Sequence, residues 1–281
     1  MIEADAYLKS LIKEQIPEYS ARIDSEIGFV EASIGRMVPA LSEEKRKGNL
    51  LRVAVEPYNI LPVDKDSFKT DMSDIKNLYP YYPFNLFIER KLYMHNMSHA
   101  LTAYLGNIKG YEFIYQAIAD CDIRYAVLRA LVQSAQAVAK ENGAEIGFLL
   151  SHAENLLYRF TNEALGDTVI RVGKDTVRKL GSNDRLIGAI KLCEKHSLSC
   201  EYLCVGVASG MYFAPESDHS SIELKAFAKE NGAIKTLQKY SDYNGKNLKL
   251  IETLYSMLGE GKTVKEVIDY CDMVSGREIR V

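Results

Sequence analysis

The sequence predicts a mainly α-helical protein: a helical bundle with a small N-terminal layer of β and irregular structure. Six of the seven prolines lie within the first 83 residues. Proline removes a backbone donor and interrupts helix interiors, so long helices are expected after residue 84. From Phe84 onward, apolar residues recur at the spacing of one helix face, most clearly between Ile123 and Val138. These two patterns together define the predicted fold class.

The individual elements follow from local patterns. An amphipathic helix is expected over residues 5–16, and two short apolar stretches, 28–32 and 51–55, predict strands. A helix beginning near Ile123 should stop at Asn142 and Gly143. Further helices are expected near residues 145–160, 185–196, 200–213, 221–238 and 246–258. Gly206 and Gly210 lie four residues apart in one of them, which favours close packing between helices.

Composition and charge exclude several classes of partner. The 281 residues are 47% hydrophobic and 26% charged, a balance typical of a globular chain. A net charge of −3 provides no field that would gather nucleic acid or an anionic membrane surface. The longest uncharged run, from Tyr202 to Pro215, is shorter than the ~20 apolar residues of a membrane span. Neither nucleic acid nor a membrane is therefore an expected partner.

The five cysteines are odd in number and include no Cys-x-x-Cys pair, which favours a reducing cytoplasmic location over secretion. The N-terminus is acidic and has no apolar signal region. Cys193, His196, Cys200 and Cys204 superficially suggest zinc ligands. Structural zinc sites usually combine short-spaced ligand pairs from two segments, so no metal cofactor is expected.

The stretch from residue 87 to 100 contains the candidate chemistry. At about 100° per residue, Lys91, Asn96 and His99 project within an arc of about 140° on one side of an α-helix. A base, an amide and an imidazole could thus meet at one alcohol oxygen. The lysine would need a lowered pKa, with burial and the nearby Arg90 and His95 as expected causes. The alternative is an ordinary helix with two solvated basic residues and a core histidine.

The residues from Lys91 to Ala100 resemble the signature of the long-chain polyol-specific dehydrogenases and reductases, the mannitol dehydrogenase family. Residues 29–39 resemble the segment that follows the cofactor domain there, and residues 89–92 are similar to the mannitol-phosphate branch. A second match lies at residues 159–162 and continues through residues 167–186. The resemblance spans residues 5 to at least 190.

The resemblance implies that residues 1–281 form the C-terminal substrate and catalytic domain, with an N-terminal Rossmann domain absent from the chain. No Gly-x-Gly-x-x-Gly turn for a dinucleotide occurs in the sequence. The implied reaction is zinc-independent hydride transfer between a sugar alcohol, or its phosphate, and NAD or NADP. Lys91 would be the general base, Asn96 and His99 would hold the reacting oxygen, and Arg159 and Asn162 would line the polyol pocket.

Two further questions stay open at this point. Arg178, Lys179 and Arg185 suit a substrate phosphate, or alternatively form an ion-pair face with Asp175 and Asp184. The chain is either part of an enzyme completed by a separate nucleotide-binding domain, or a non-catalytic helical interaction module that has lost its cofactor domain.

Overall fold

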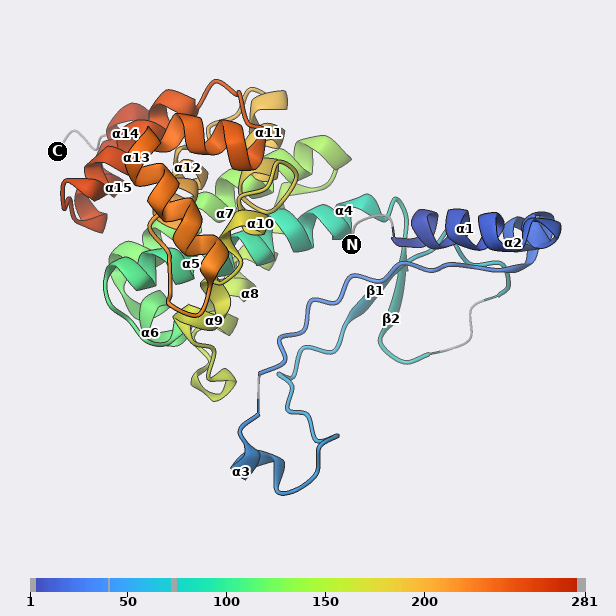
Figure 1. Ribbon diagram of the computed structural model, residues 1–281. Helices are drawn as coiled ribbons and strands as arrows, with labels where there is room; N and C mark the ends of the chain where they lie inside the picture. Colours follow the sequence, from blue (N-terminus) through green and yellow to red (C-terminus); the bar gives the residue numbers. More distant parts are fainter. Residues whose placement is uncertain (1–3, 40, 72–74, 277–281) are drawn as a thin grey trace.

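The computed structural model describes residues 4–39, 41–71 and 75–276, and it confirms the mainly α-helical class (Figure 1). Residues from 84 onward form a helical body. The preceding residues form an N-terminal region that projects from one side of this body. The two parts meet where α4 (Asn85–Glu89) enters the body.

The N-terminal region contains short elements joined by long irregular segments. Its elements are α1 (Ala4–Gln15), η1 (Pro17–Tyr19), α2 (Ser20–Glu26), α3 (Glu43–Arg46), β1 (Leu61–Asp64) and β2 (Leu78–Tyr81). Helix α1 confirms the helix predicted over residues 5–16. Strands β1 and β2 pair in parallel, with Leu61 opposite Leu78.

The predicted strands at residues 28–32 and 51–55 were wrong. The first contributes only an isolated antiparallel bridge between Ala32 and Val63, and residues 51–55 form no strand. A strand needs a second strand to pair with, whereas the Leu51 and Arg52 N–H groups donate to Asn49 in a local turn and no described strand pairs with residues 51–55. The actual strands contain Pro62 and Pro80. Proline interrupts central strands, but each strand of a two-stranded sheet is an edge strand, where proline is tolerated.

The body is built from helices. They are α4, the π-helical segment η2 (Arg90–Asn96), α5 (Met97–Ile108), α6 (Ile114–Ala119), α7 (Cys121–Asn142), α8 (Ile146–Phe160), η3 (Glu163–Leu165), α9 (Val169–Gly173), α10 (Thr176–Lys179), α11 (Ile187–Lys195), α12 (Glu201–Gly210), α13 (His219–Ser241), α14 (Leu248–Gly259) and α15 (Val264–Val274). Those with predicted limits, α7, α8 and α11 to α14, begin and end close to them. As predicted, α7 stops at Gly143, which adopts a left-handed conformation. No described helix has both the length and the apolarity of a membrane span.

Helices α5 and α12 lie at the centre of the core. Every residue of α12 except Glu201 is buried, as expected for a helix that is apolar on all sides. A Cβ added at Gly206 would lie 2.6 Å from Leu186, and one added at Gly210 would lie 3.0 Å from Tyr104 on α5. The glycines therefore permit the close helix packing predicted from their spacing. Helix α5 continues directly from η2, so this packing also fixes the segment that contains Lys91 and Asn96.

Candidate active site

Lys91 and Asn96 both lie on η2, which is a π-helix and not the α-helix assumed from the sequence. In an α-helix, residues five positions apart are offset by about 140° around the axis. The i→i+5 hydrogen bonds of a π-helix widen the turn, so that such residues lie nearly above one another. Both side chains accordingly line one hollow of about 290 Å³, together with residues of the N-terminal region such as Ser33.

The Lys91 amine is poised to lose its proton near neutral pH. Burial, together with the positive charges of Arg159 and Arg185, lowers the pKa of Lys91 to about 8. A substantial fraction of the amine is therefore uncharged just above neutrality. A lysine can act as a proton acceptor only in that form.

The positive field at Lys91 does not come from the residues expected from the sequence. The Arg90 guanidinium lies over the Phe87 ring, 4.4 Å from its centroid, and is absent from the charges that shift the lysine. Burial lowers the pKa of His95 well below its ordinary value, so this imidazole is uncharged. Arg159 and Arg185, distant in sequence, take the role predicted for these neighbours.

His99 lies one helical turn beyond Asn96 as a partly buried, neutral imidazole. Its ring stacks on Phe160 with the centroids 4.9 Å apart. Burial lowers the pKa of His99 to about 3. Its Nε2 is 3.5 Å from an Asp167 carboxylate oxygen and has no hydrogen-bond partner among the described residues. His99 lines a small cavity with Asn162 and is not among the residues that line the hollow of Lys91 and Asn96.

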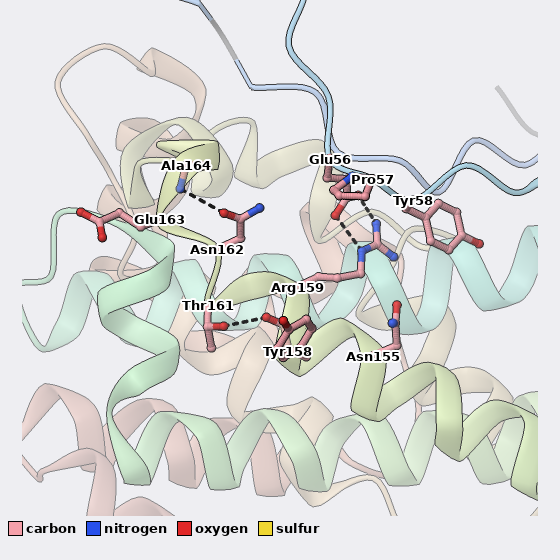
Figure 2. A pocket seen from close by; sticks show the side chains of 10 residues that line it. All are labelled: Glu56, Pro57, Tyr58, Asn155, Tyr158, Arg159, Thr161, Asn162, Glu163 and Ala164. Carbon is pink, nitrogen blue, oxygen red and sulfur yellow. Dashed lines mark hydrogen bonds and ion pairs between the residues drawn. The ribbon is translucent and has the colours of Figure 1, made fainter.

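Arg159 is fixed at the edge of a larger cavity of about 940 Å³ (Figure 2). Its Nε donates to Glu56 Oε2 at 2.9 Å, and its Nη2 donates both to Glu56 Oε1 and to the Gly35 carbonyl. The guanidinium also lies over the Tyr58 ring, 4.5 Å from its centroid. This side chain of α8 thus joins the body to the N-terminal region.

Asn162 lies between the two cavities. It lines the large one with Arg159 and the small one with His99. Its Oδ1 accepts the backbone N–H of Ala164 at 3.1 Å and so caps η3 (Figure 2). Asn162 thus lies beside Arg159 in one cavity and beside His99 in the other, although the three residues belong to two separate sequence motifs.

The basic cluster is engaged in contacts within the protein. Arg178 pairs with Asp175 and, at 3.3 Å, with Asp184. Arg185 Nε donates to the same Asp184 at 2.8 Å. The Lys179 amine donates to the Val172 carbonyl at 2.6 Å. None of these three cations lines the cavities of Lys91, Arg159 or His99.

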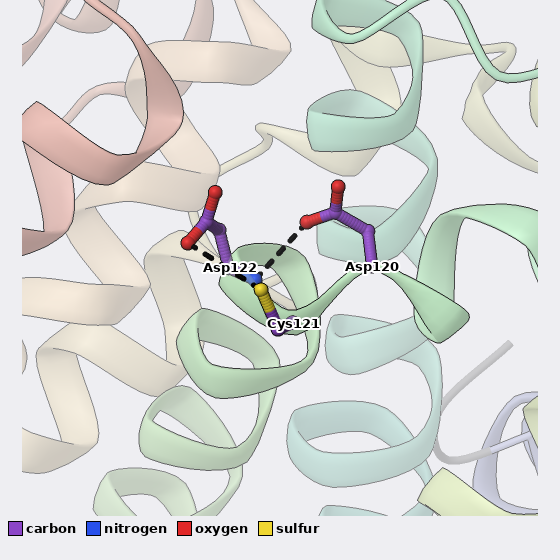
Figure 3. A group of neighbouring side chains, drawn as sticks. All are labelled: Asp120, Cys121 and Asp122. Carbon is purple, nitrogen blue, oxygen red and sulfur yellow. Dashed lines mark hydrogen bonds between the residues drawn. The ribbon is translucent and has the colours of Figure 1, made fainter.

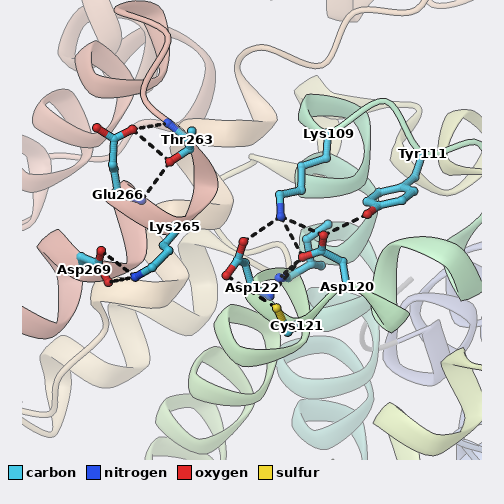
Figure 4. A network of polar contacts seen from close by, with 10 residues as sticks. Lys109, Tyr111, Asp120, Cys121, Asp122, Thr263, Lys265, Glu266 and Asp269 are labelled. Carbon is cyan, nitrogen blue, oxygen red and sulfur yellow. Dashed lines mark hydrogen bonds and ion pairs between the residues drawn. The ribbon is translucent and has the colours of Figure 1, made fainter.

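One group of potential metal ligands is already paired with a lysine. The ligand atoms of Asp120, Cys121 and Asp122 lie within 4.8 Å of one another (Figure 3). The Lys109 amine donates to the Asp120 and Asp122 carboxylates at 2.8 Å, and Tyr111 also donates to Asp120 (Figure 4). Asp120 in addition caps α7. The cluster therefore has a structural explanation.

The cysteines and histidine that superficially suggest zinc are occupied by other contacts. Cys193, Cys200 and Cys204 are buried in the apolar core. His196 Nε2 lies 2.7 Å from Glu141. These contacts give each side chain a structural role.

Comparison with known proteins identifies the family. Residues 84–271 match the profile of the mannitol dehydrogenase C-terminal domain. The chain belongs to this family. Mannitol-1-phosphate 5-dehydrogenase of Caldanaerobacter subterraneus subsp. tengcongensis is 31% identical over 242 residues, which are 84% of this chain and 61% of that protein. The chain thus spans about three fifths of the length of this curated relative.

Solved structures with the same fold are also polyol dehydrogenases. Mannitol 2-dehydrogenase of Pseudomonas fluorescens, in a ternary complex with NAD and D-mannitol, superposes with a TM-score of 0.73 at 18% identity over 94% of this chain and 58% of that one. A substrate-free D-sorbitol dehydrogenase gives a TM-score of 0.73 at 18% identity, over 92% of this chain and 57% of that one. At this identity the likeness establishes the fold of the mannitol dehydrogenase C-terminal domain.

Sequence reasoning missed three residues at the site: Glu56, Tyr58 and Asp167. Glu56 is only 4% exposed, although it follows an apolar stretch in a proline-rich region. An acidic residue directly after an apolar stretch can be buried with that stretch. Because a buried carboxylate requires a cationic partner, such an acid indicates a buried ion pair. Asp167 was part of the matched motif but had no assigned role.

Proposed function

We propose that the chain is the substrate-binding and base-supplying part of an NAD(P)-dependent polyol dehydrogenase, acting on mannitol or a mannitol-1-phosphate-like sugar alcohol. The observation that carries the proposal is the half-buried Lys91, with its pKa lowered to about 8, beside Asn96 in one hollow. The names of its relatives support the substrate class. The NAD in the mannitol 2-dehydrogenase complex supports a nicotinamide cofactor.

The chemistry of alcohol oxidation explains these residues. The neutral Lys91 amine accepts the hydroxyl proton as the carbon–oxygen bond gains double-bond character. The Asn96 amide and the neutral His99 imidazole donate hydrogen bonds to the oxygen on which negative charge develops. Arg159 and Asn162 bind the remaining hydroxyl groups of the polyol. A bound nicotinamide supplies the hydride acceptor.

We assign the dinucleotide site to a part of the enzyme outside the described residues. Their strands are the single pair β1 and β2, whereas dinucleotides bind at the end of a larger parallel sheet with a glycine-rich turn. We therefore propose that a nucleotide-binding domain, joined or separate, completes the enzyme. Its docking surface would include the exposed apolar side chains of the N-terminal region, of which Leu50 and Leu51 are more than 80% exposed.

A substrate phosphate remains part of the proposal for Arg178, Lys179 and Arg185. Binding of such a group would require the arginines to exchange their aspartate partners for phosphate oxygens. A polyol phosphate should then raise the Tm of the chain more than the free polyol does, because a ligand bound by the folded state stabilises it. Equal shifts would indicate that the cluster is purely structural.

The decisive experiment replaces the base. The chain is assayed for polyol oxidation with NAD after addition of a nucleotide-binding domain of the mannitol dehydrogenase family. Oxidation should rise as the pH rises through about 8, because only the neutral Lys91 accepts a proton. Lys91→Ala should reduce kcat by about 10²–10⁴-fold and abolish that pH dependence. The matched control Lys235→Ala, an exposed position on α13, should retain both.

A second variant distinguishes proton acceptance by Lys91 from stabilisation of the developing negative charge by Asn96. Asn96→Ala should lower kcat by weakening the hold on the developing charge, while the rise through about pH 8 stays visible. Near-normal turnover of Lys91→Ala with an unchanged pH profile would instead show that the lysine is structural. Such a result would favour the non-catalytic interaction module.

A further inference from the structure

We infer that Glu56 is a positioning residue of the active site: it holds the Arg159 guanidinium in one orientation and offsets its positive charge beside Lys91. This inference rests on the proposed function, since it assigns Glu56 a role through the proposed base. Glu56 and Arg159 lie 103 positions apart and come from the N-terminal region and the body respectively. Their side chains are only 4% and 7% exposed.

The contacts leave the guanidinium little freedom. Both Glu56 oxygens accept from Arg159, and Oε1 also accepts the Met37 backbone N–H at 2.6 Å. The Gly35 carbonyl accepts from Arg159 Nη2 at 2.6 Å, and Tyr58 covers one face of the group. A planar, two-point pair of this kind fixes orientation as well as distance.

One nitrogen of the Arg159 guanidinium takes no part in these hydrogen bonds. Nη1 is buried and has no hydrogen-bond partner among the described residues. In Figure 2 this nitrogen lies on the side of the guanidinium away from the Glu56 carboxylate. A buried donor without a partner is unfavourable, and a polar ligand in the adjoining cavity of about 940 Å³ is a suitable acceptor after a small local adjustment. Glu56 therefore determines which donor of Arg159 remains for a substrate.

The Glu56–Arg159 pair also influences the pKa of Lys91. Arg159 and Arg185 lower the pKa of Lys91, whereas the negative charge of Glu56 raises it. Without Glu56, the positive charge of Arg159 would act on the lysine unopposed. The charged and titratable groups around this amine come from several elements: Glu31, Glu56, His95, His99, His152, Arg159 and Arg185. Burial lowers the pKa of each of the three histidines, so they are uncharged at neutral pH.

The test measures the ionisation of Lys91 directly in this chain, without a cofactor domain. Competitive acylation with acetic anhydride over a pH series, read by mass spectrometry of the peptide containing Lys91, reports the neutral amine. The native midpoint should lie near 8. Glu56→Gln should lower it, so that Lys91 is acylated about three- to tenfold faster at pH 7. Glu163→Gln, at an exposed position on the same cavity, is the matched control and should leave the midpoint unchanged.

A folded Glu56→Gln variant with the native midpoint would overturn the inference; its fold is verified by circular dichroism. Removal of a buried counter-ion can itself prevent folding. In that event the double variant Glu56→Gln/Arg159→Gln, which buries no unpaired charge, replaces it. Its midpoint should rise above the native value, because Arg159 has the larger influence on Lys91. A native midpoint in the double variant would equally refute the electrostatic role.

Kinetics of the completed enzyme then test the orienting role. Glu56→Gln should raise KM for the polyol and shift the rise of kcat to lower pH, and Glu56→Asp should restore part of both. A KM and pH profile identical to those of the native enzyme would contradict the inference. If Lys91→Ala retains activity while Glu56→Gln still shifts the acylation midpoint, the proposed function fails and the electrostatic coupling stands.

Discussion

The helical body buries most of its apolar side chains, whereas the N-terminal region exposes many of them. In the body, Leu101 and its neighbours on α5 are completely buried. In the N-terminal region, Leu50 and Leu51 are 82% and 88% exposed, and Ile23 is one of few buried apolar residues. The contrast indicates that the body supplies most of the folding free energy. The N-terminal region presents a surface and contributes a few anchored residues, chiefly Glu56.

The largest expected effect tests this contrast directly. Leu101→Ala should lower the free energy of unfolding by about 2–5 kcal/mol, because it leaves a cavity in the core. Leu51→Ala should change it by no more than about 0.5 kcal/mol. Urea denaturation of both variants provides the measurement. Comparable losses would mean that the N-terminal region belongs to the same cooperative core.

A second effect concerns the surface role of the N-terminal region. If a nucleotide-binding domain covers Leu50 and Leu51, replacing both with serine should weaken docking by about 1.5–3 kcal/mol for each leucine that becomes fully buried. The stability of the isolated chain should remain nearly unchanged. Titration calorimetry with a separately produced domain measures the affinity. Unaltered binding would place the docking surface elsewhere.

A third effect arises from partly buried histidines, and all five histidines of the sequence lie in the body. Burial lowers the pKa of His99 and of His152 to about 3, against about 6.5 in an unfolded chain. As the pH falls below 6.5, the unfolded state binds protons that the folded state does not. Stability should therefore decrease by up to about 1.4 kcal/mol per pH unit for each such group.

The measurement compares urea unfolding at pH 7.5 and pH 5.5 for the native chain and His152→Gln. The variant should lose less stability on acidification, because glutamine does not titrate. An equal loss in both proteins would assign the acid sensitivity to other groups.

The smallest expected effect is on stability, and it compares a glycine of the body with a glycine of the N-terminal region. Gly147 lies in the first turn of α8, and an added Cβ would meet no atom within 4 Å. Gly147→Ala should thus stabilise the body by about 0.5 kcal/mol through helix propensity. At Gly28 an added Cβ would lie 2.5 Å from the Ser67 carbonyl oxygen, so Gly28→Ala should give no such gain. A gain at both positions would indicate a looser N-terminal region. Thermal melts of both variants decide this.

Much of the body could be predicted because its helices follow local rules. Apolar spacing gave the extent of α7, and a glycine marked its end. The N-terminal region could not be predicted in this way. Its strands contain prolines, and its exposed apolar stretch at residues 51–55 mimics a strand without having a partner. Here packing partners determine the structure, and a short pattern does not reveal them.

The sequence predicted part of the geometry of the candidate site and did not predict its electrostatics. Of the three residues predicted to converge, Lys91 and Asn96 line the same hollow, whereas His99 lines a different cavity. The charges that shift the lysine come from Arg159 and Arg185, whereas proximity in sequence pointed to Arg90 and His95. Long-range partners such as Glu56 are brought in by the fold, so spacing along the chain carries no information about them.

The π-helical turn at η2 also has a consequence for the length of the chain. A π-helical turn contains one more residue than the α-helical turn that it replaces. Deleting a single residue between Lys91 and Asn96 would restore α-helical winding and leave the two residues four positions apart. Residues at that spacing lie on one face of an α-helix, so the lysine and the amide would still face the same side. A one-residue deletion should therefore disturb the hollow less here than in a segment that is already α-helical, where it would rotate the flanking residues by about 100°.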